Sequence, residues 1–168
     1  VCSELRCTPD PSVWAGLLDG SGDVTVLART PTSSEILALM MFFTQKEWQL
    51  PEFLHLGSPV MWGAAGHGNW LCRSLSMNCS KLTNLVGLDL EGVGLDGDGI
   101  KVLSSCADSM KHIQSLNVKR NYLYIKEGSK HLVSFLQILD HPLCVLDVSN
   151  NGLQVADVQA LRNSVGGH

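Results

Sequence analysis

The sequence predicts an α/β solenoid, with a curved parallel sheet on the inside and helices on the outside. Three observations favour this fold: a repeated eleven-residue pattern, short alternating apolar segments, and helical apolar stripes between them. The pattern occurs as LVGLDLEGVGL at 85–95, IQSLNVKRNYL at 113–123 and LCVLDVSNNGL at 143–153. The equivalent leucines Leu88, Leu116 and Leu146 are roughly 30 residues apart, which is the spacing expected of stacked structural repeats.

Two weaker copies precede these. Leu54-His-Leu56 and, before it, Val24-Thr-Val26 continue the series upstream of Leu88 at a similar spacing. Both lack the asparagine of the pattern, since Pro59 and Arg29 occupy its position. We therefore divide the chain into an incomplete repeat or N-terminal cap at 1–19, two degenerate repeats at 20–84, and three regular repeats at 85–168 that end in a truncated or capping helix.

Each repeat predicts one strand and one helix. The alternating segments predict strands of about three residues, because apolar side chains at every second position point to one face. Helix starts are indicated by Asp10-Pro11 and by the capping box Thr32–Glu35. Pro142 is expected to stop the helix before it. Apolar stripes typical of helices occur at Leu71, Leu75 and Leu82, at Ile100, Leu103 and Ala107, and at Leu132, Phe135 and Leu139.

The three regular copies fit the pattern LxxLxLxxNxL, with Val93 as the single departure. A repeat of this kind with full helices resembles the ribonuclease-inhibitor-like class of leucine-rich repeats, closely over 85–161 and more loosely over 20–84. The resemblance implies that the leucines face the core and that the residues between them face the concave surface. It also implies a structural role for Asn121 and Asn151, whose side chains would bond to turn backbone along the stack.

Counting on that basis gives the candidate binding surface. A central column of exposed residues contains Thr25, His55, Asp89, Asn117 and Asp147, and a second column contains Leu27, Gly57, Glu91, Lys119 and Ser149. The loops that leave the strands add aromatic and arginine side chains, which dominate many protein interfaces. The partner-binding candidates are His55, Trp62, Asp89, Glu91, Asn117, Lys119, Arg120, Tyr122, Tyr124 and Asp147.

Composition and motifs argue against several other functions. A net charge of −4 and a pI near 5.8 disfavour a nucleic-acid partner. No apolar run approaches the roughly 20 residues of a membrane span. The glycines at 63–68 and 20–22 form neither a phosphate-binding loop nor a dinucleotide fingerprint, and no HExxH or paired CxxC is present. We expect no catalytic site, metal or cofactor, while a small-molecule ligand stays open.

The six cysteines favour a reducing compartment, the cytoplasm or alternatively the nucleus. Cys72, Cys79, Cys106 and Cys144 fall within predicted helices or beside a strand, where a free thiol acts as a small buried hydrophobe. Only Cys2 and Cys7 are placed to pair locally. Cys72 and His67 are expected to face different sides of a helix, because their separation does not match a helical turn. The Asn78-Cys79-Ser80 sequon also lies in a predicted helix.

These features predict a non-catalytic protein-binding or ligand-sensing module of a larger intracellular protein. Repeats of the class it resembles form the C-terminal region of nucleotide-binding immune receptors and occur in intracellular scaffolds. The alternatives are a regulator of an enzyme, of the inhibitor or GTPase-activating type, and a cytoskeletal adaptor. The mixture of acidic and basic residues on the predicted concave face favours the first hypothesis over an inhibitor.

Overall fold

Five short strands form one parallel sheet in the order in which they occur in the chain. This computed structural model describes the backbone of residues 23–25 and residues 52–57 and 63–165. The strands are β1 (Asp23–Thr25), β2 (Phe53–His55), β3 (Gly87–Asp89), β4 (Ser115–Asn117) and β5 (Val145–Asp147). Each is as short as predicted, but begins just before the leucine of its alternating segment.

The strands pair in one continuous register. Leu54 lies opposite Leu88, which lies opposite Leu116, and Leu116 lies opposite Leu146. The residue after each of these leucines also lies opposite its equivalent on the next strand. The predicted central column is therefore confirmed as one row across the sheet. Its members are Thr25, His55, Asp89, Asn117 and Asp147.

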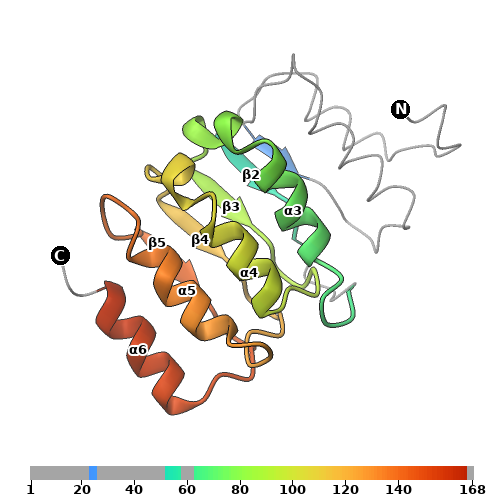
Figure 1. Ribbon diagram of the computed structural model, residues 1–168, viewed down its shortest axis with the longest axis vertical. Coiled ribbons are helices and arrows are strands. Elements are labelled where there is room, and N and C mark those ends of the chain that lie inside the picture. Colours follow the sequence, from blue (N-terminus) through green and yellow to red (C-terminus); the bar gives the residue numbers. More distant parts are fainter. Residues whose placement is uncertain (1–22, 26–51, 58–62, 166–168) are drawn as a thin grey trace, which may run out of the picture.

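Four helices lie side by side along one face of the sheet, in chain order (Figure 1). They are α3 (Asn69–Met77), α4 (Gly97–Ser104), α5 (Gly128–Leu136) and α6 (Val155–Val165). The α/β class with a parallel sheet is thus confirmed. The sheet was expected to be curved, and it is not strongly curled. The start of α4 packs closely against the chain just before α5, because a Cβ at Gly97 would collide with the carbonyl oxygen of Lys126. Helices that pack this closely require little curvature of the sheet beneath them.

The helices are shorter than their apolar stripes predict. α3 ends at Met77, and Leu82 lies in a separate 3-10 helix, Cys79–Asn84. Ala107 likewise lies in a 3-10 helix, Ala107–Met110, beyond the end of α4. α5 ends at Leu136, well before Pro142, so that proline is not what ends it. The chain must return to the sheet within a few residues, and a 3-10 helix covers more length per residue than an α-helix.

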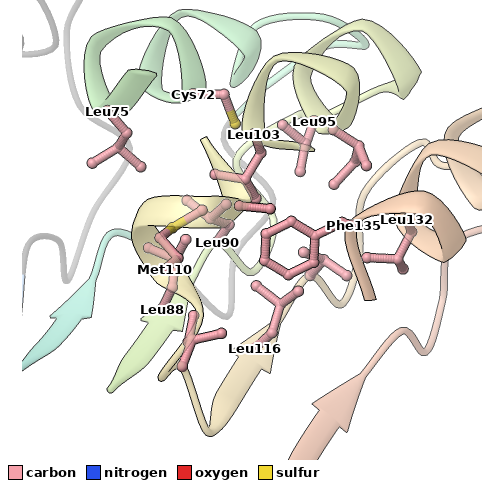
Figure 2. Close-up of a cluster of buried hydrophobic side chains, with 14 of the residues drawn as sticks. Cys72, Leu75, Leu88, Leu90, Leu95, Leu103, Met110, Leu116, Leu132 and Phe135 are labelled. Atoms are coloured by element: carbon pink, nitrogen blue, oxygen red, sulfur yellow. The ribbon is translucent and has the colours of Figure 1, made fainter. Parts of the chain in front are cut away.

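One apolar layer fills the space between the sheet and the helices. Figure 2 shows strand and helix side chains meeting in this layer, among them Leu88 and Leu116 from the sheet and Phe135 from α5. These three side chains are at most 2% exposed. The inward direction of the leucines is therefore confirmed for β2, β3 and β4. The predicted helix starts at Asp10-Pro11 and Thr32–Glu35 lie outside the described residues, and the division at 84/85 stays a prediction.

The predicted asparagine ladder is confirmed. Asn121 is 3% exposed, and its Oδ1 accepts hydrogen bonds from the backbone N–H groups of Gly94 (3.0 Å) and Leu95 (2.8 Å). Its Nδ2 donates to the carbonyls of Leu90 and Val118 at 2.8 and 2.9 Å. One side chain thereby joins the loops of two consecutive strands. Such a buried amide replaces backbone partners that the turn itself cannot supply.

Where the pattern has Val93 in place of asparagine, close packing at glycines connects the two successive loops instead. Val93 is fully buried, and the backbone of the preceding loop lies directly against it. A Cβ at Gly63 would collide with the carbonyl oxygen of Val93, and one at Gly68 would lie 2.6 Å from its Cγ2. The Gly68 N–H donates to the carbonyl of Gly94 at 3.2 Å. Part of the glycine cluster at 63–68 thus serves close backbone packing.

Candidate binding face

The face of the sheet opposite the helices carries three rows of side chains, of which the sequence predicted two. The row that was missed precedes the leucine of each strand and consists of Phe53, Gly87, Ser115 and Val145. These residues alternate with the buried leucines and therefore face the same side as the central column. The alternation itself was the signal that could have found them.

The missed row adds apolar area to the face. A Cβ at Gly87 would lie 2.5 Å from Cδ1 of Phe53, so the Phe53 ring covers the glycine on the neighbouring strand. At the other end of the row, Val145 is 54% exposed. The face therefore presents an aromatic ring and an aliphatic side chain beside the polar central column.

The central column owes its residue types to turn geometry. In Asp89, Asn117 and Asp147, the side-chain Oδ1 accepts a hydrogen bond from the backbone N–H two residues later, at 2.9, 3.0 and 2.9 Å. This is the Asx arrangement, in which a short polar side chain completes the turn after a strand. One oxygen of each side chain is thus used internally, and only the remaining side-chain atoms are available to a partner.

Asp147 shows the electrostatic consequence. Hydrogen bonds from the side chain and the backbone N–H of Ser149 hold the pKa of this carboxyl below its usual range. Bonds donated to a carboxylate favour its ionised form. Asp147 is therefore negatively charged at neutral pH and presents that charge beside Ser149 at the last strand.

A charged group connects the second column to the loop after β4. Glu91 Oε1 lies 3.6 Å from both Lys119 Nζ and Arg120 Nε, and Asn117 Nδ2 donates to Glu91 Oε2 at 3.5 Å. The Glu91 side chain is 16% exposed, against 30% for Lys119 and 40% for Arg120. Glu91 thus lies beneath the two cations and orients them, while the cations are the more accessible to a partner.

At the β2 end of the face, His55 approaches the central column. Its Nδ1 lies 3.6 Å from Asp89 Oδ2, and the His55 side chain is 41% exposed. This pair is charged on both sides only when the imidazole is protonated, and at such exposure it contributes little to stability.

The loop after β4 displays large side chains where the neighbouring loops have small ones. Arg120 has a left-handed backbone with φ of 56°, and the equivalent positions are Gly92 and Asn150, with φ of 66° and 57°. Glycine and asparagine adopt this conformation most readily, whereas for arginine it is unfavourable. Further along the same loop, Tyr122 stands where the other loops have Gly94 and Gly152.

Two tyrosines extend this loop toward the last repeat. The ring centroids of Tyr122 and Tyr124 are 6.4 Å apart, with an interplanar angle of 54°. Tyr124 is 59% exposed and lies against Gly152, where a Cβ would be 2.8 Å from its Cδ1. Arg120, Tyr122 and Tyr124 belong to the same loop, and we call these three residues the β4 loop surface. Trp62, Leu27 and the side chain of Thr25, which were also expected on this face, lie outside the described part of the chain.

A polar cluster at the N-terminal ends of α3 and α4 is structural in character. Asp96 is 2% exposed and caps α4 by accepting from the backbone N–H of Asp98 at 2.9 Å. Burial opposes its ionisation, but hydrogen bonds from Asn69 (2.6 Å) and Lys126 (3.2 Å) outweigh this effect and lower its pKa. The cluster joins three consecutive repeats. All of its polar groups have partners within the protein, which gives no reason to assign it a ligand.

The thiols and histidines do not come together as a reactive site. Burial raises the pKa of Cys72 far above its usual range and that of Cys106 to about 11, which leaves both thiols protonated and unreactive. His67 is exposed and lies in the turn before α3, while Cys72 is fully buried within α3, so the two are not on different sides of one helix as the sequence predicted, although their environments differ. Across residues 52–57 and 63–165, no three His, Cys, Asp or Glu side chains are placed to hold a metal ion.

The cysteines and the asparagine of the sequon depart in part from the sequence expectations. Cys72, Cys79, Cys106 and Cys144 are free thiols, as expected, but only Cys72 and Cys106 are buried. Cys79 is partly buried, and Cys144, which precedes the edge strand β5, is exposed. Asn78 of the sequon lies just after α3 rather than within it, and is only 8% exposed. Its Nδ2 donates to the carbonyl of Ser74 at 2.9 Å, and a glycan on this nitrogen would disrupt that bond in the folded chain.

Comparison with known proteins does not identify the chain. No protein-family model, no curated protein and no solved structure matches it. Among the described residues, no helix has the length and apolar character needed to cross a membrane.

Proposed function

We propose that this chain is a leucine-rich-repeat solenoid of the ribonuclease-inhibitor-like class and that it binds another protein without catalysing a reaction. The binding surface is the open face of the sheet together with the β4 loop surface. We further propose that it belongs to a larger intracellular protein, located in the cytoplasm or alternatively in the nucleus. The repeat assignment is supported by the one-to-one strand register and by the two asparagines that join successive loops.

The observation that carries the binding proposal is the identity of the residues on the β4 loop surface. Among the loops after β3, β4 and β5, which the structure describes completely, only the β4 loop has arginine at the left-handed position and tyrosine shortly after it. Folding alone favours the glycines and asparagine of the other loops. Arginine and tyrosine are also the residues that most often contribute strongly to protein interfaces. A binding role accounts for both facts.

The charges on this face favour a general protein-binding role over inhibition of a basic enzyme by an acidic surface. An inhibitor of a basic enzyme would present uncompensated acidic side chains. Here Glu91 faces Lys119 and Arg120, and Asp89 and Asp147 each use one oxygen in a local turn. The mixture of aromatic, aliphatic and paired charged residues is typical of a protein-binding surface. Regulation of an enzyme and cytoskeletal adaptation stay alternatives on the same scaffold.

The proposal is tested by affinity capture from cell lysate with the wild-type chain and the Tyr122→Ala/Tyr124→Ala double variant. We expect a protein recovered by the wild type to be lost with the double variant. With the captured protein purified, the double variant should raise its Kd at least tenfold, because two interface aromatics each contribute about 1 kcal/mol or more.

Trp70→Ala serves as the matched control. Trp70 is 53% exposed and lies on α3 in the helix layer, where it stacks with Arg73 at 5.1 Å from guanidinium carbon to ring centroid. Removal of this aromatic should leave recovery and Kd unchanged. Equal recovery by the wild type and the double tyrosine variant would contradict the proposed surface.

A further inference from the structure

The last repeat has the apolar pattern of the repeats before it but does not bury it. Leu116 of β4 and Val118 after it are fully buried, whereas their equivalents Leu146 and Val148 are only partly buried. The helices differ more. Ile100 of α4 and Leu132 of α5 are 0% exposed, while Val158, at the same place in the stripe of α6, is 51% exposed.

The backbone of the last repeat is also incompletely paired. The Leu90 N–H donates to the carbonyl of Asn117 at 2.8 Å, and the Val118 N–H donates to that of Asp147 at 2.9 Å. The equivalent donor after β5 is the Val148 N–H, for which the described residues supply no acceptor. The Asn150 N–H likewise has no acceptor among the described residues. Its equivalents, the N–H groups of Gly92 and Arg120, donate to carbonyls of the following repeat at 2.9 and 3.0 Å.

The loop of the last repeat lacks one more partner. The N–H groups of Gly94 and Leu95 donate to Oδ1 of Asn121, and the Leu123 N–H donates to Oδ1 of Asn151 at 3.4 Å. The corresponding N–H groups of Gly152 and Leu153 have no such acceptor among the residues that the structure describes. Three kinds of interaction that hold the inner repeats together are thus open on the same side of the last one.

We propose that this terminal face, formed by the outer edge of β5, the loop at 148–153 and the outer side of α6, is a docking face for a further strand–loop–helix unit of the same repeating chemistry. The occupant lies parallel to β5, with an apolar residue opposite Leu146. It also places a carboxamide oxygen at the N–H groups of Gly152 and Leu153. This face adjoins the β4 loop surface, since Tyr124 lies against Gly152, but the proposal does not depend on the partner of that surface.

The interfaces already present in the molecule specify this occupant. The pairs β2–β3, β3–β4 and β4–β5 share one parallel register. Polar contacts also recur between successive repeats near the starts of the helices, since Lys126, just before α5, forms an ion pair with Asp98 of α4, and Ser129 of α5 donates to Asp157 of α6 at 2.7 Å. A second copy of this chain related by a twofold axis would instead place two β5 strands antiparallel. That arrangement would not reproduce the register or supply the carboxamide.

The test extends the chain with a copy of its own residues 111–142. The copy is fused after His168. The copied Leu116 then follows Leu146 by the same number of residues as the original Leu116 follows Leu88, so the repeat period is kept. We expect hydrogen exchange at the Val148 and Asn150 amides to slow at least a hundredfold relative to the unextended chain. Their protection should then approach that of the Val118 and Arg120 amides, and the urea midpoint of the chain should rise.

Two matched variants keep the result specific. An extension whose copied Leu116 is replaced by Asp should leave exchange at Val148 unchanged. Val158→Asp should remove the gain in urea midpoint in the extended chain, while it should leave the midpoint of the unextended chain nearly unchanged because the side chain is exposed there.

Either of two results would overturn the proposal. One is an extended chain whose Val148 and Asn150 amides exchange as fast as in the unextended chain. The other is a concentration-dependent dimer of the unextended chain, seen by light scattering, in which these amides are already protected. That second result would assign the terminal face to a second copy.

Discussion

Residues 113–136 and residues 143–165 carry the same apolar pattern but have different physical environments. Both begin with an eleven-residue segment that ends in Asn-x-Leu, and both continue into a helix with an apolar stripe. In the first region the stripe residues Leu132 and Phe135 are 0% exposed, whereas in the second Val158 is 51% exposed and Leu161 is 4% exposed. The pattern therefore specifies which face an apolar side chain takes, and the neighbouring repeat determines how completely that face is buried.

The comparison also explains why the stack is stabilised unevenly. Each repeat contacts mainly the repeat before it and the repeat after it, so its stability depends on both neighbours. An inner repeat obtains burial and hydrogen bonds from two sides. The last one obtains them from one side among the described residues, and it is therefore expected to open more readily than the repeats within the stack.

The largest effect is expected from removing the strand leucine of an inner repeat. Leu116→Ala should reduce the free energy of unfolding by about 3.5 kcal/mol, because it leaves a cavity at a fully buried site. Leu146→Ala should cost about 1 kcal/mol, since Leu146 is only partly buried. Urea unfolding followed by circular dichroism measures both. Equal losses for the two variants would show that the terminal face is covered in solution.

A somewhat smaller effect is expected from the asparagine ladder. Asn121→Ala leaves the N–H groups of Gly94 and Leu95 without their side-chain acceptor and should reduce the free energy of unfolding by about 2.5 kcal/mol.

Asn151→Ala should cost about 1.5 kcal/mol. Its Oδ1 accepts only a long 3.4 Å bond from Leu123, although its Nδ2 donates to the carbonyls of Val118 and Val148 at 2.8 and 2.9 Å. The same urea assay applies to both variants. A larger loss for Asn151→Ala than for Asn121→Ala would reverse the predicted order of the two repeats.

The smallest effect on stability is expected at the left-handed position of the β4 loop. Arg120→Gly relieves an unfavourable backbone conformation but removes a half-exposed contact with Glu91. These two effects are each about 1 kcal/mol or less and oppose one another, so the free energy of unfolding should change by less than about 0.5 kcal/mol.

Binding to the partner protein should weaken in the same variant, because a side chain of the proposed surface is lost. Asn150→Gly, at the equivalent position of the next loop, is the control and should leave both stability and Kd nearly unchanged. Calorimetric titration with the captured partner measures the affinity. A large loss of stability in Arg120→Gly would mean that Arg120 has a mainly structural role.

Features that depend on local sequence were predicted best. The short strands, the central column and the roles of Asn121 and Asn151 follow from residue spacing, because a strand alternates with a period of two and the repeats are in register. The Asx turns of Asp89, Asn117 and Asp147 were missed although their signal was present. Each is an Asp or Asn shortly before the left-handed segment, and its polarity was interpreted as a binding feature alone.

Features that depend on distant contacts could not be predicted in the same way. Asp96 owes its lowered pKa to Asn69 of the preceding repeat and to Lys126 of the following one. The ends of α3, α4 and α5 follow from where the chain must turn back to the sheet. The position of the Phe53 ring over Gly87 became apparent only when the strands were placed beside one another.

The sequence by itself determined the repeat period, the inward direction of the leucines and the positions of the joining asparagines, because each arises from local backbone geometry at a fixed spacing. Only the tertiary structure decided which of these equivalent residues are buried and which charges are paired. It also decided that Tyr124 lies against Gly152 of the next loop. The physical reason is that burial and electrostatic environment are set by neighbours from other repeats, and an isolated repeat does not contain them.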